Sequence, residues 1–309
     1  MKDYVCVIGG ANIDISSTSF NPLILHDSNP SKTTLSLGGV ARNVAENLSR
    51  LGADVEFITV IGSDAYAAQI ELSCKELGIS TAHGLRRNCA TSTYLCINDE
   101  KGDMFVAASD MEILSALDMD FLSTKKSVID NAKAVIIDTN LSAELIEYIT
   151  SSAKAPVFVE TVSANKTKKI VGHKGGFAVK PNLIETEILA QMKISSDADL
   201  ELAAEKLHGL GYEWVAVTLG ERGAFYSDGK TNGFVKQTVN NIVNTTGAGD
   251  SFFAALVWGF TKSLDLKTCC VLGNRAAALT LMSEHTVNPS LAPDKIVQNL
   301  FKKVNNYEK

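Results

Sequence analysis

The sequence predicts an α/β fold of three layers, in which a mostly parallel central sheet lies between two layers of helices and a small β-sheet is added. Three observations predict it. Short apolar runs alternate with segments of helical period, and these runs are hydrophobic almost without interruption, as strands buried on both faces are. Two β-rich regions break the alternation. The 309 residues are 45% hydrophobic, which is enough for one large core, and we expect a single domain over residues 1–309.

Six apolar runs are expected to form strands of the central sheet. In chain order they are 4–10, 55–62, 134–138, 156–160, 176–180 and 214–220. The segment after the first β-rich region illustrates the helices. Val40, Val44, Leu48 and Leu51 recur at helical spacing, and Gly52 supplies a C-terminal stop. This rhythm of strand, helix and strand predicts parallel pairing with helices on both faces of the sheet.

The two β-rich regions cover about 14–37 and 91–110. The first has two prolines, strand-like ends and no helical period. The second is typical of a hairpin, with two β-rich runs around a turn at 98–102. Because neither region fits the alternation, we expect both to form a small separate sheet at one edge of the main domain.

Composition disfavours several classes of protein. The 29 basic and 35 acidic residues give a formal charge of −6, which argues against a nucleic-acid partner, and the lysines at 166, 168 and 169 are expected to be a solvated helix face. The six cysteines include no CxxC pair and no zinc-type cluster, and Cys6 and Cys96 are expected to be buried. No leader peptide and no apolar stretch of ~18 residues is apparent, so we expect a cytoplasmic protein with free thiols and no membrane partner.

A single acid, Asp250, precedes an apolar helix in the stretch "NTTGAGDSFFAALVWGF" at 244–260. Gly247, Ala248 and Gly249 allow the backbone to bend and to approach a ligand closely. The first N–H groups of a helix lack internal partners and carry partial positive charge, so they bind anions. The carboxylate either caps the helix, which is worth ~1 kcal/mol, or acts as a base beside a phosphoryl group held by those N–H groups.

A second group of polar residues follows the first strand. Asn12 and Asp14 lie just beyond it on one face, and Gly38 and Gly39 precede a helix that carries Asn43 in its first turns. A carboxylate and an amide together suit a vicinal diol. The alternative is an Asx turn with a glycine N-cap. The sequence lacks the P-loop pattern, and "GGAN" after the first strand is a weak dinucleotide signal.

In combination, "GGAN-D", "GGVARN", "KPNLIE", "VTLGERGA" and "NTTGAGDSF" resemble, in order and spacing, the ribokinase-like (PfkB) family of carbohydrate and nucleoside kinases. The resemblance covers essentially residues 3–300. It implies a ribokinase-like fold, with the small sheet as a lid over the substrate and often a homodimer surface. It also implies ATP and Mg²⁺ as cofactors and a small-molecule sugar or nucleoside as substrate.

The resemblance implies a role for each matching residue. Asp250 would be the base that takes the proton of a primary hydroxyl, and the N–H groups of Gly247, Ala248 and Gly249 would form the anion hole, which suits a reaction that depends on positioning and charge neutralisation. The sugar hydroxyls would be held by Asn12, Asp14, Gly38, Gly39 and Asn43. The N-x-x-E pair, Asn182 and Glu185, would organise Mg²⁺ and the phosphates, partly through water. The nucleotide would be faced by Thr218, Gly220 and, on the adenine side, Asn274.

One departure concerns a monovalent cation. Many members have Asp where this chain has Asn244, and that Asp helps to bind an activating cation. Asn retains an oxygen ligand but loses a charge, so a K⁺ effect stays open. The expected ligand carriers are Asn244, Thr246, Asn288 and Ser290.

Within the family, the hairpin is more similar to pseudouridine kinases than to ribokinases or fructokinases, through Tyr94-Leu95, Gly102-Asp103-Met104 and Asp110-Met111. The expected reaction is phosphorylation of the 5′-hydroxyl of pseudouridine, with Thr93 and the 109–111 turn near the base. The alternatives are a kinase for ribose, fructose or a sugar phosphate, a ribonucleoside kinase, and an inactive ligand-binding homologue. A nicotinamide oxidoreductase is disfavoured because the glycine fingerprint is missing.

Overall fold

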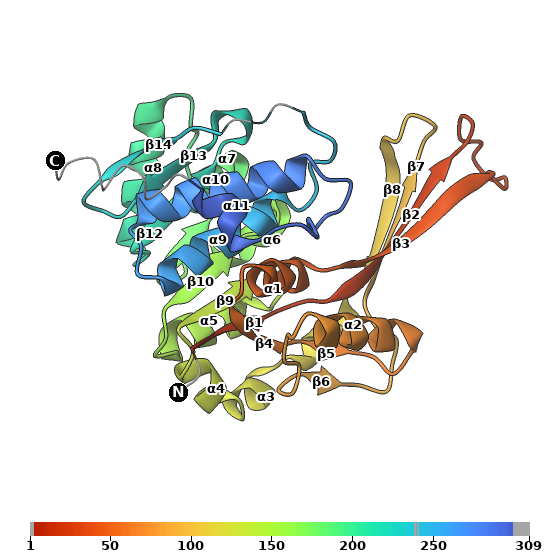
Figure 1. Ribbon diagram of the computed structural model, residues 1–309, viewed down its shortest axis with the longest axis horizontal. Coiled ribbons are helices and arrows are strands. Elements are labelled where there is room, and N and C mark those ends of the chain that lie inside the picture. Colours follow the sequence, from red (N-terminus) through yellow and green to blue (C-terminus); the bar gives the residue numbers. More distant parts are fainter. Residues whose placement is uncertain (1–2, 238, 240, 299–309) are drawn as a thin grey trace.

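A computed structural model describes residues 3–237, 239 and 241–298 of the chain. Its main sheet has eight strands in the order β14-β13-β12-β11-β10-β9-β1-β4, and the six strands from β12 to β4 are parallel, whereas β13 and β14 pair antiparallel at one edge (Figure 1). The strands are β1 (Tyr4–Ile8), β4 (Asp54–Ile58), β9 (Ala134–Asp138), β10 (Val157–Glu160), β11 (Ala178–Lys180), β12 (Trp214–Thr218), β13 (Ala224–Ser227) and β14 (Asn232–Val235). The ends of the predicted domain, 1–2 and 299–309, lie outside the described residues.

Two apolar cores lie on opposite faces of this sheet and make the three layers. Successive side chains of β1 enter different cores. Val5 and Val7 belong to the first core, and Cys6 and Ile8 belong to the second. The first core is covered by α1 (Val40–Arg50), α2 (Ala65–Glu76), α9 (Ala248–Thr261), α10 (Leu266–Leu281) and α11 (Pro293–Val297). The second is covered by α3 (Met119–Ser123), α4 (Lys126–Asp130), α5 (Ala143–Ser152), α7 (Leu183–Ala190) and α8 (Asp197–Gly209). The predicted three-layer fold is confirmed.

Shorter elements connect these layers. A 3₁₀ helix, η1 (Glu112–Ala116), follows the small sheet, and α6 (Ala164–Thr167) with η2 (Lys168–Ile170) joins β10 to β11. A third 3₁₀ turn, η3 (Gly220–Arg222), follows β12. The predicted strand 55–62 is in fact two strands, because β5 (Val60–Ile61) leaves the main sheet to pair with β6 (Leu85–Arg86).

The two β-rich regions form one four-stranded sheet, in the order β3-β2-β7-β8, that projects from the body of the molecule (Figure 1). Its strands are β2 (Asn12–Ser19), β3 (Ser31–Gly38), β7 (Thr93–Asn98) and β8 (Met104–Asp110). We call it the lid sheet. It is joined through a parallel pairing of β2 with β7, although the two strands are remote in sequence. The predicted sheet and its hairpin are confirmed.

The register gives the lid sheet one polar and one apolar face. Asp14 pairs with Ser36 and Tyr94, whereas the next residue, Ile15, pairs with Leu35 and Leu95. Paired residues share a face and neighbours alternate, so the carboxylate lies on the polar side. The apolar face includes Leu35, Leu95 and Val106, which are 56%, 39% and 49% exposed.

Two smaller expectations are wrong in detail. Cys96 is only half-buried, because it lies in the projecting lid sheet instead of a core strand. The Lys166 ammonium donates to the side chain of Asn140 and is half-buried, so this lysine does not belong to a solvated face. Within the described part of the chain, no helix is both long and apolar enough to cross a bilayer.

Candidate active site

Asp250 lies in the first turn of α9, next to Gly249, which approaches the side chain of Lys180 at the end of β11. Gly247 is the N-cap, with φ of +82°, and a Cβ added there would lie 1.9 Å from the carbonyl oxygen of Thr286. The chain therefore requires glycine at this turn. The Asp250 side chain makes no capping bond to the helix. This geometry removes the reading of Asp250 as a simple helix cap.

The carboxylate of Asp250 is held by a residue from the other end of the chain. Asn43 Nδ2 donates a 2.9 Å hydrogen bond to Asp250 Oδ2. Burial raises the pKa of Asp250 to about 6, and this hydrogen bond and the charge of Lys180 oppose the rise. A carboxylate with such a pKa is mostly ionised at neutral pH and can still accept a proton.

The start of α9 also offers uncommitted donors. The backbone N–H groups of Ala248, Gly249 and Asp250 have no hydrogen-bond acceptor among the residues that the structure describes. Such groups at a helix N-terminus bind anions. The Asp250 carboxylate and these uncommitted N–H groups thus lie in the same turn of α9.

The start of α1 brings Asn43 into place through close backbone contact. Gly39 is the N-cap of α1 with φ of +98°, and a Cβ there would lie 2.5 Å from the carbonyl oxygen of Gly10. The glycine N-cap that the alternative reading expected is therefore present, but the Asx turn is not, because Asn12 and Asp14 lie within β2.

Asn12 and Asp14 form a pair on the polar face of the lid sheet. Asn12 Nδ2 donates to Asp14 Oδ1 at 2.6 Å. A Cβ on Gly38 would lie 2.3 Å from Asp14 Oδ2, so the bare glycine leaves room for the carboxylate. Burial raises the pKa of Asp14, against the hydrogen bond from Asn12 and the charge of Arg42. The carboxylate of Asp14, the amide of Asn12 and the backbone of Gly38 therefore lie together at the place where the substrate diol was expected.

Thr93 does not share this face. It pairs with Ile13 in the register of β2 and β7, one residue away from the pairing of Asp14 with Tyr94. The Thr93 side chain is therefore on the face opposite Asp14, so the register does not favour its expected contact with the substrate base. Tyr94 lies beside Asp14 instead, and its hydroxyl approaches Met104 Sδ at 3.7 Å.

The residues expected to bind the nucleotide converge on one cavity. It has a volume of about 570 Å³ and lies between the end of β12, the start of α9 and the middle of α10. Of the predicted residues it is lined by Thr218, Gly220, Ala248, Gly249 and Asn274. Asn274 is fixed there because its Nδ2 donates 2.8 Å to the carbonyl oxygen of Val235. The cavity reaches the same helix start as Asp250, so a bound nucleotide could present its phosphates to those N–H groups.

The N-x-x-E pair lies at the start of α7 and forms a capping box. Glu185 N donates to Asn182 Oδ1 at 2.9 Å, and Asn182 N donates to Glu185 Oε2 at 2.8 Å. Thr161 Oγ1 donates a further bond of 2.6 Å to Glu185 Oε2. The pair therefore has a structural role that the sequence reasoning missed. Its oxygen donors suit Mg²⁺, which needs only one or two protein carboxylates beside phosphate and water.

The four expected cation-ligand residues sit in two loops that follow α10 and precede α9. Asn244 Oδ1 accepts from Thr246 N at 2.9 Å, and its Nδ2 donates to the carbonyl oxygen of Glu284 at 3.3 Å. Asn288 Oδ1 accepts from both the N–H and the hydroxyl of Ser290 at 2.9 Å. The amide oxygens of Asn244 and Asn288 are thus used within their own turns.

Sequence reasoning overlooked a group of buried charges under the site. Lys180 at the end of β11 forms an ion pair with Glu160 at the end of β10, with 3.1 Å between Nζ and Oε1. Asp138, at the end of β9, is 1% exposed and its Oδ2 has no partner among the described residues. Charged residues inside otherwise apolar strands are the signal that would have found them.

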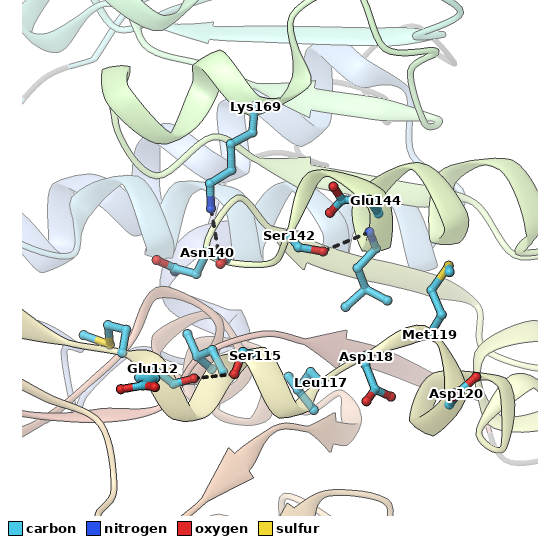
Figure 2. Close-up of a pocket in the computed structure, with 13 residues that line it drawn as sticks. Glu112, Ser115, Leu117, Asp118, Met119, Asp120, Asn140, Ser142, Glu144 and Lys169 are labelled. Carbon is cyan, nitrogen blue, oxygen red and sulfur yellow. Dashed lines mark hydrogen bonds between the residues drawn. The ribbon is translucent and has the colours of Figure 1, made fainter.

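A second cavity, of about 590 Å³, lies between η1 and the loop that joins β9 to α5 (Figure 2). Of the residues that were expected near a ligand, Met111 of the 109–111 turn lines it, and the expected catalytic, sugar-binding and nucleotide-binding residues do not. Lys169 points toward the loop at Asn140 and donates bonds of 3.1 Å to the carbonyl oxygens of Thr139 and Leu141, so its charge stabilises the loop.

Known proteins share this architecture. The model of the pfkB family carbohydrate kinases matches residues 2–293. The pseudouridine kinase of Escherichia coli K12 is 33% identical over 313 residues, covering 99% of this chain and 98% of its own length. The guanosine-inosine kinase of Exiguobacterium acetylicum is 29% identical, covering 90% and 94%. The ribokinase of Arabidopsis thaliana, solved with ribose and ATP, superimposes with a TM-score of 0.82 at 20% identity, covering 98% and 99%, and shows the fold.

Proposed function

The chain belongs to the pfkB family of carbohydrate kinases, and we propose that it is the member that transfers the γ-phosphate of ATP to the 5′-hydroxyl of pseudouridine. The products are pseudouridine 5′-phosphate and ADP. Phosphotransfer to a hydroxyl group, with ATP and Mg²⁺, is the chemistry of the family. The observation that carries the choice of substrate is the full-length similarity to a pseudouridine kinase.

Asp250 is the proposed base. It removes the proton of the acceptor hydroxyl as that oxygen attacks the γ-phosphorus, and the bond from phosphorus to the β-phosphate oxygen breaks. The backbone N–H groups of Gly247, Ala248 and Gly249 receive the charge of the transferring group. Asn182 and Glu185 would hold Mg²⁺ partly through water, and the ion would neutralise charge on the phosphates.

The arginine whose charge reaches Asp14 favours an acceptor that carries no phosphate. This residue, Arg42, is buried, pairs with Glu46 and donates a 3.1 Å hydrogen bond to the carbonyl oxygen of Leu37. Because its guanidinium group is engaged, a sugar phosphate would lack its charge, whereas the neutral ribose of a nucleoside needs only groups such as Asn12 and Asp14.

A purine ribonucleoside is the second candidate substrate, favoured by the similarity to a guanosine-inosine kinase. The experiment is ADP release with ATP and Mg²⁺ against pseudouridine, uridine, guanosine, ribose and fructose at equal concentration. Strong preference for pseudouridine over uridine supports the proposal, because it requires a site that distinguishes the C-linked base. Preference for guanosine, ribose or fructose would reject pseudouridine as the substrate but keep the kinase. No ADP with any acceptor would favour an inactive ligand-binding homologue.

We further propose that the protein is cytoplasmic, where ATP is supplied. We also propose that it forms a homodimer through the apolar face of the lid sheet. Leu35, Leu95 and Val106 share that face and are exposed in the single chain. A second copy of the same sheet would bury them against equal apolar surface. Sedimentation of the Leu35→Glu, Leu95→Glu variant should show monomer where the wild type shows dimer. A wild type that sediments as monomer at micromolar concentration would reject this assembly.

A further inference from the structure

Lys180 is a buried ammonium beside the start of α9. Its side chain and that of its ion-pair partner Glu160 are each 5% exposed. A Cβ built on Gly249 would lie 3.4 Å from Lys180 Nζ, so the ammonium is in contact distance of the first turn of α9.

Positive charge and free donors gather in this space. The N-terminus of α9 carries partial positive charge and directs uncommitted N–H groups into it. The Lys180 ammonium lies beside them, and its charge opposes the rise in the pKa values of two carboxylates, Glu160 and Asp250. An ammonium next to the free N–H groups of a helix N-terminus suits an incoming anion.

The ion pair with Glu160 does not complete the shell of either partner. Glu160 Oε2 is buried and has no hydrogen-bond partner within the described residues. The ammonium has three donors, of which Glu160 Oε1 takes one. Glu160 therefore holds Lys180 in place, and donors of the ammonium stay available toward the helix start.

We propose that Lys180 contacts the transferring γ-phosphoryl group and stabilises the charge that develops on its oxygens, with Glu160 as its positioning residue. This inference rests on the proposed kinase reaction but not on the identity of the acceptor. Lys180 keeps its protons throughout: the acceptor oxygen forms the new bond to phosphorus, the bond to the β-phosphate oxygen breaks, and the acceptor proton goes to Asp250. The ammonium adds a charged donor to the backbone N–H groups, which carry only partial charge.

The test compares Lys180→Met, the double variant Lys180→Met, Glu160→Gln, and Lys180→Arg with the wild type. The double variant is needed because Lys180→Met alone would leave the buried carboxylate of Glu160 unpaired. That unpaired charge could unfold the protein whether or not Lys180 contacts the phosphoryl group. Lys206→Met is the matched control, since Lys206 donates 3.0 Å to the carbonyl oxygen of Ala190, in the contact between α8 and α7.

Two quantities are measured with the acceptor that the wild type turns over. One is kcat, and the other is the affinity for ADP with and without aluminium fluoride, which with ADP imitates the transferring phosphoryl group. We expect kcat of the double variant to fall about 100-fold or more. The affinity of the double variant for ADP should stay within about threefold of the wild-type value. The increase in affinity that aluminium fluoride gives the wild type should be lost. The Lys180→Arg variant should retain part of the wild-type kcat. The control Lys206→Met should change neither kcat nor the affinity for ADP.

Two results would overturn the inference. One is a folded double variant with wild-type kcat and the full gain from aluminium fluoride. The other is an equal loss of affinity for ADP alone and for ADP with aluminium fluoride, together with a lower Tm. A lysine with a purely structural role would produce that pattern. A wild type that releases no ADP with any acceptor is a separate failure and would reject the kinase proposal itself.

Discussion

The side-chain amide of Asn43 donates a 2.9 Å hydrogen bond to the carboxylate of Asp250, although the two residues are 207 positions apart. The bond connects the start of α1 to the start of α9. Each helix begins at a glycine with positive φ, Gly39 and Gly247, that no larger residue could replace without a backbone clash. The two most specific segments of the sequence thus meet at one carboxylate.

The first prediction concerns pH. Burial raises the pKa of Asp250 to about 6, and Asp138 and Asp14 raise it further, while Asn43 and Lys180 lower it. A base must be unprotonated, so kcat/KM should be flat above this pKa and fall about tenfold per pH unit below it. Asn43→Ala removes a bond to the charged form and should move the midpoint to higher pH. The matched control is Asn47→Ala, one turn along α1, whose amide bonds the carbonyl oxygen of Asn43 instead of Asp250. Equal midpoints in wild type and Asn43→Ala would contradict the assignment.

The second prediction removes the base itself. Asp250→Asn keeps the size of the side chain but cannot accept the acceptor proton, so kcat should fall by ~10²–10⁴. The affinity for ATP and acceptor, measured by calorimetry, should change little. Asp197→Asn, in the exposed ion pair with Arg222, is the surface control and should leave kcat unchanged. Turnover near the wild-type rate in Asp250→Asn would show that another group takes the proton.

The third prediction separates the two substrates. Asp14 lies with Asn12 on the polar face of the lid sheet, away from the nucleotide cavity. Asp14→Ala should therefore raise the KM for the acceptor far more than the KM for ATP. Asp64→Ala is the contrasting variant, because Asp64 caps α2 through Ala67 N and accepts from Thr91. It should lower stability by about 1 kcal/mol or more without selecting between substrates. Equal changes in both KM values for Asp14→Ala would mean that its role is structural.

The fold could be predicted from the sequence because local patterns decide it. The runs that became β1, β9, β10, β11 and β12 are apolar on both faces, which only a covered parallel sheet accommodates. The hairpin of β7 and β8 was readable from its turn. The break between β4 and β5 at Thr59 was not, because the apolar run continues through it and the partner of β5, Leu85–Arg86, is remote in sequence.

The site could be predicted where a residue carries its own signal, and not where register or packing decides. Asp250 directly follows a glycine, and Asn43 lies one helical turn after one, and these glycines indicate turns. The face that Thr93 occupies could not be predicted, because a shift of one residue in the pairing of β2 with β7 exchanges it with Tyr94. Lys180 went unnoticed because its meaning depends on Glu160 and Gly249, which only the fold brings to it.

The fourth prediction tests the turn before the anion hole. Gly247→Ala adds a methyl group 1.9 Å from the carbonyl oxygen of Thr286 at a φ of +82°, so the turn must move. Gly172→Ala is the matched control, with φ of +76° and open space around it, and should cost only about 1 kcal/mol. We expect Gly247→Ala to lower Tm further than Gly172→Ala and to reduce kcat at least tenfold, because the donors are displaced. If the two variants lose the same stability and keep the same kcat, the shape of this turn does not matter for catalysis.

The fifth prediction concerns the monovalent cation. Asn244 Nδ2 donates to the carbonyl oxygen of Glu284 at 3.3 Å, so the amide nitrogen already satisfies this oxygen. In Asn244→Asp two oxygens would face each other there, and a bound cation would relieve the repulsion. We therefore expect ADP release by the wild type to respond weakly to K⁺, and release by Asn244→Asp to rise several-fold when KCl replaces tetramethylammonium chloride at equal ionic strength. Asn131→Asp is the control, since its amide bonds the carbonyl oxygen of Ser127 on the surface. A wild type that depends strongly on K⁺, or an Asn244→Asp variant that ignores it, would show that these loops do not form the cation site.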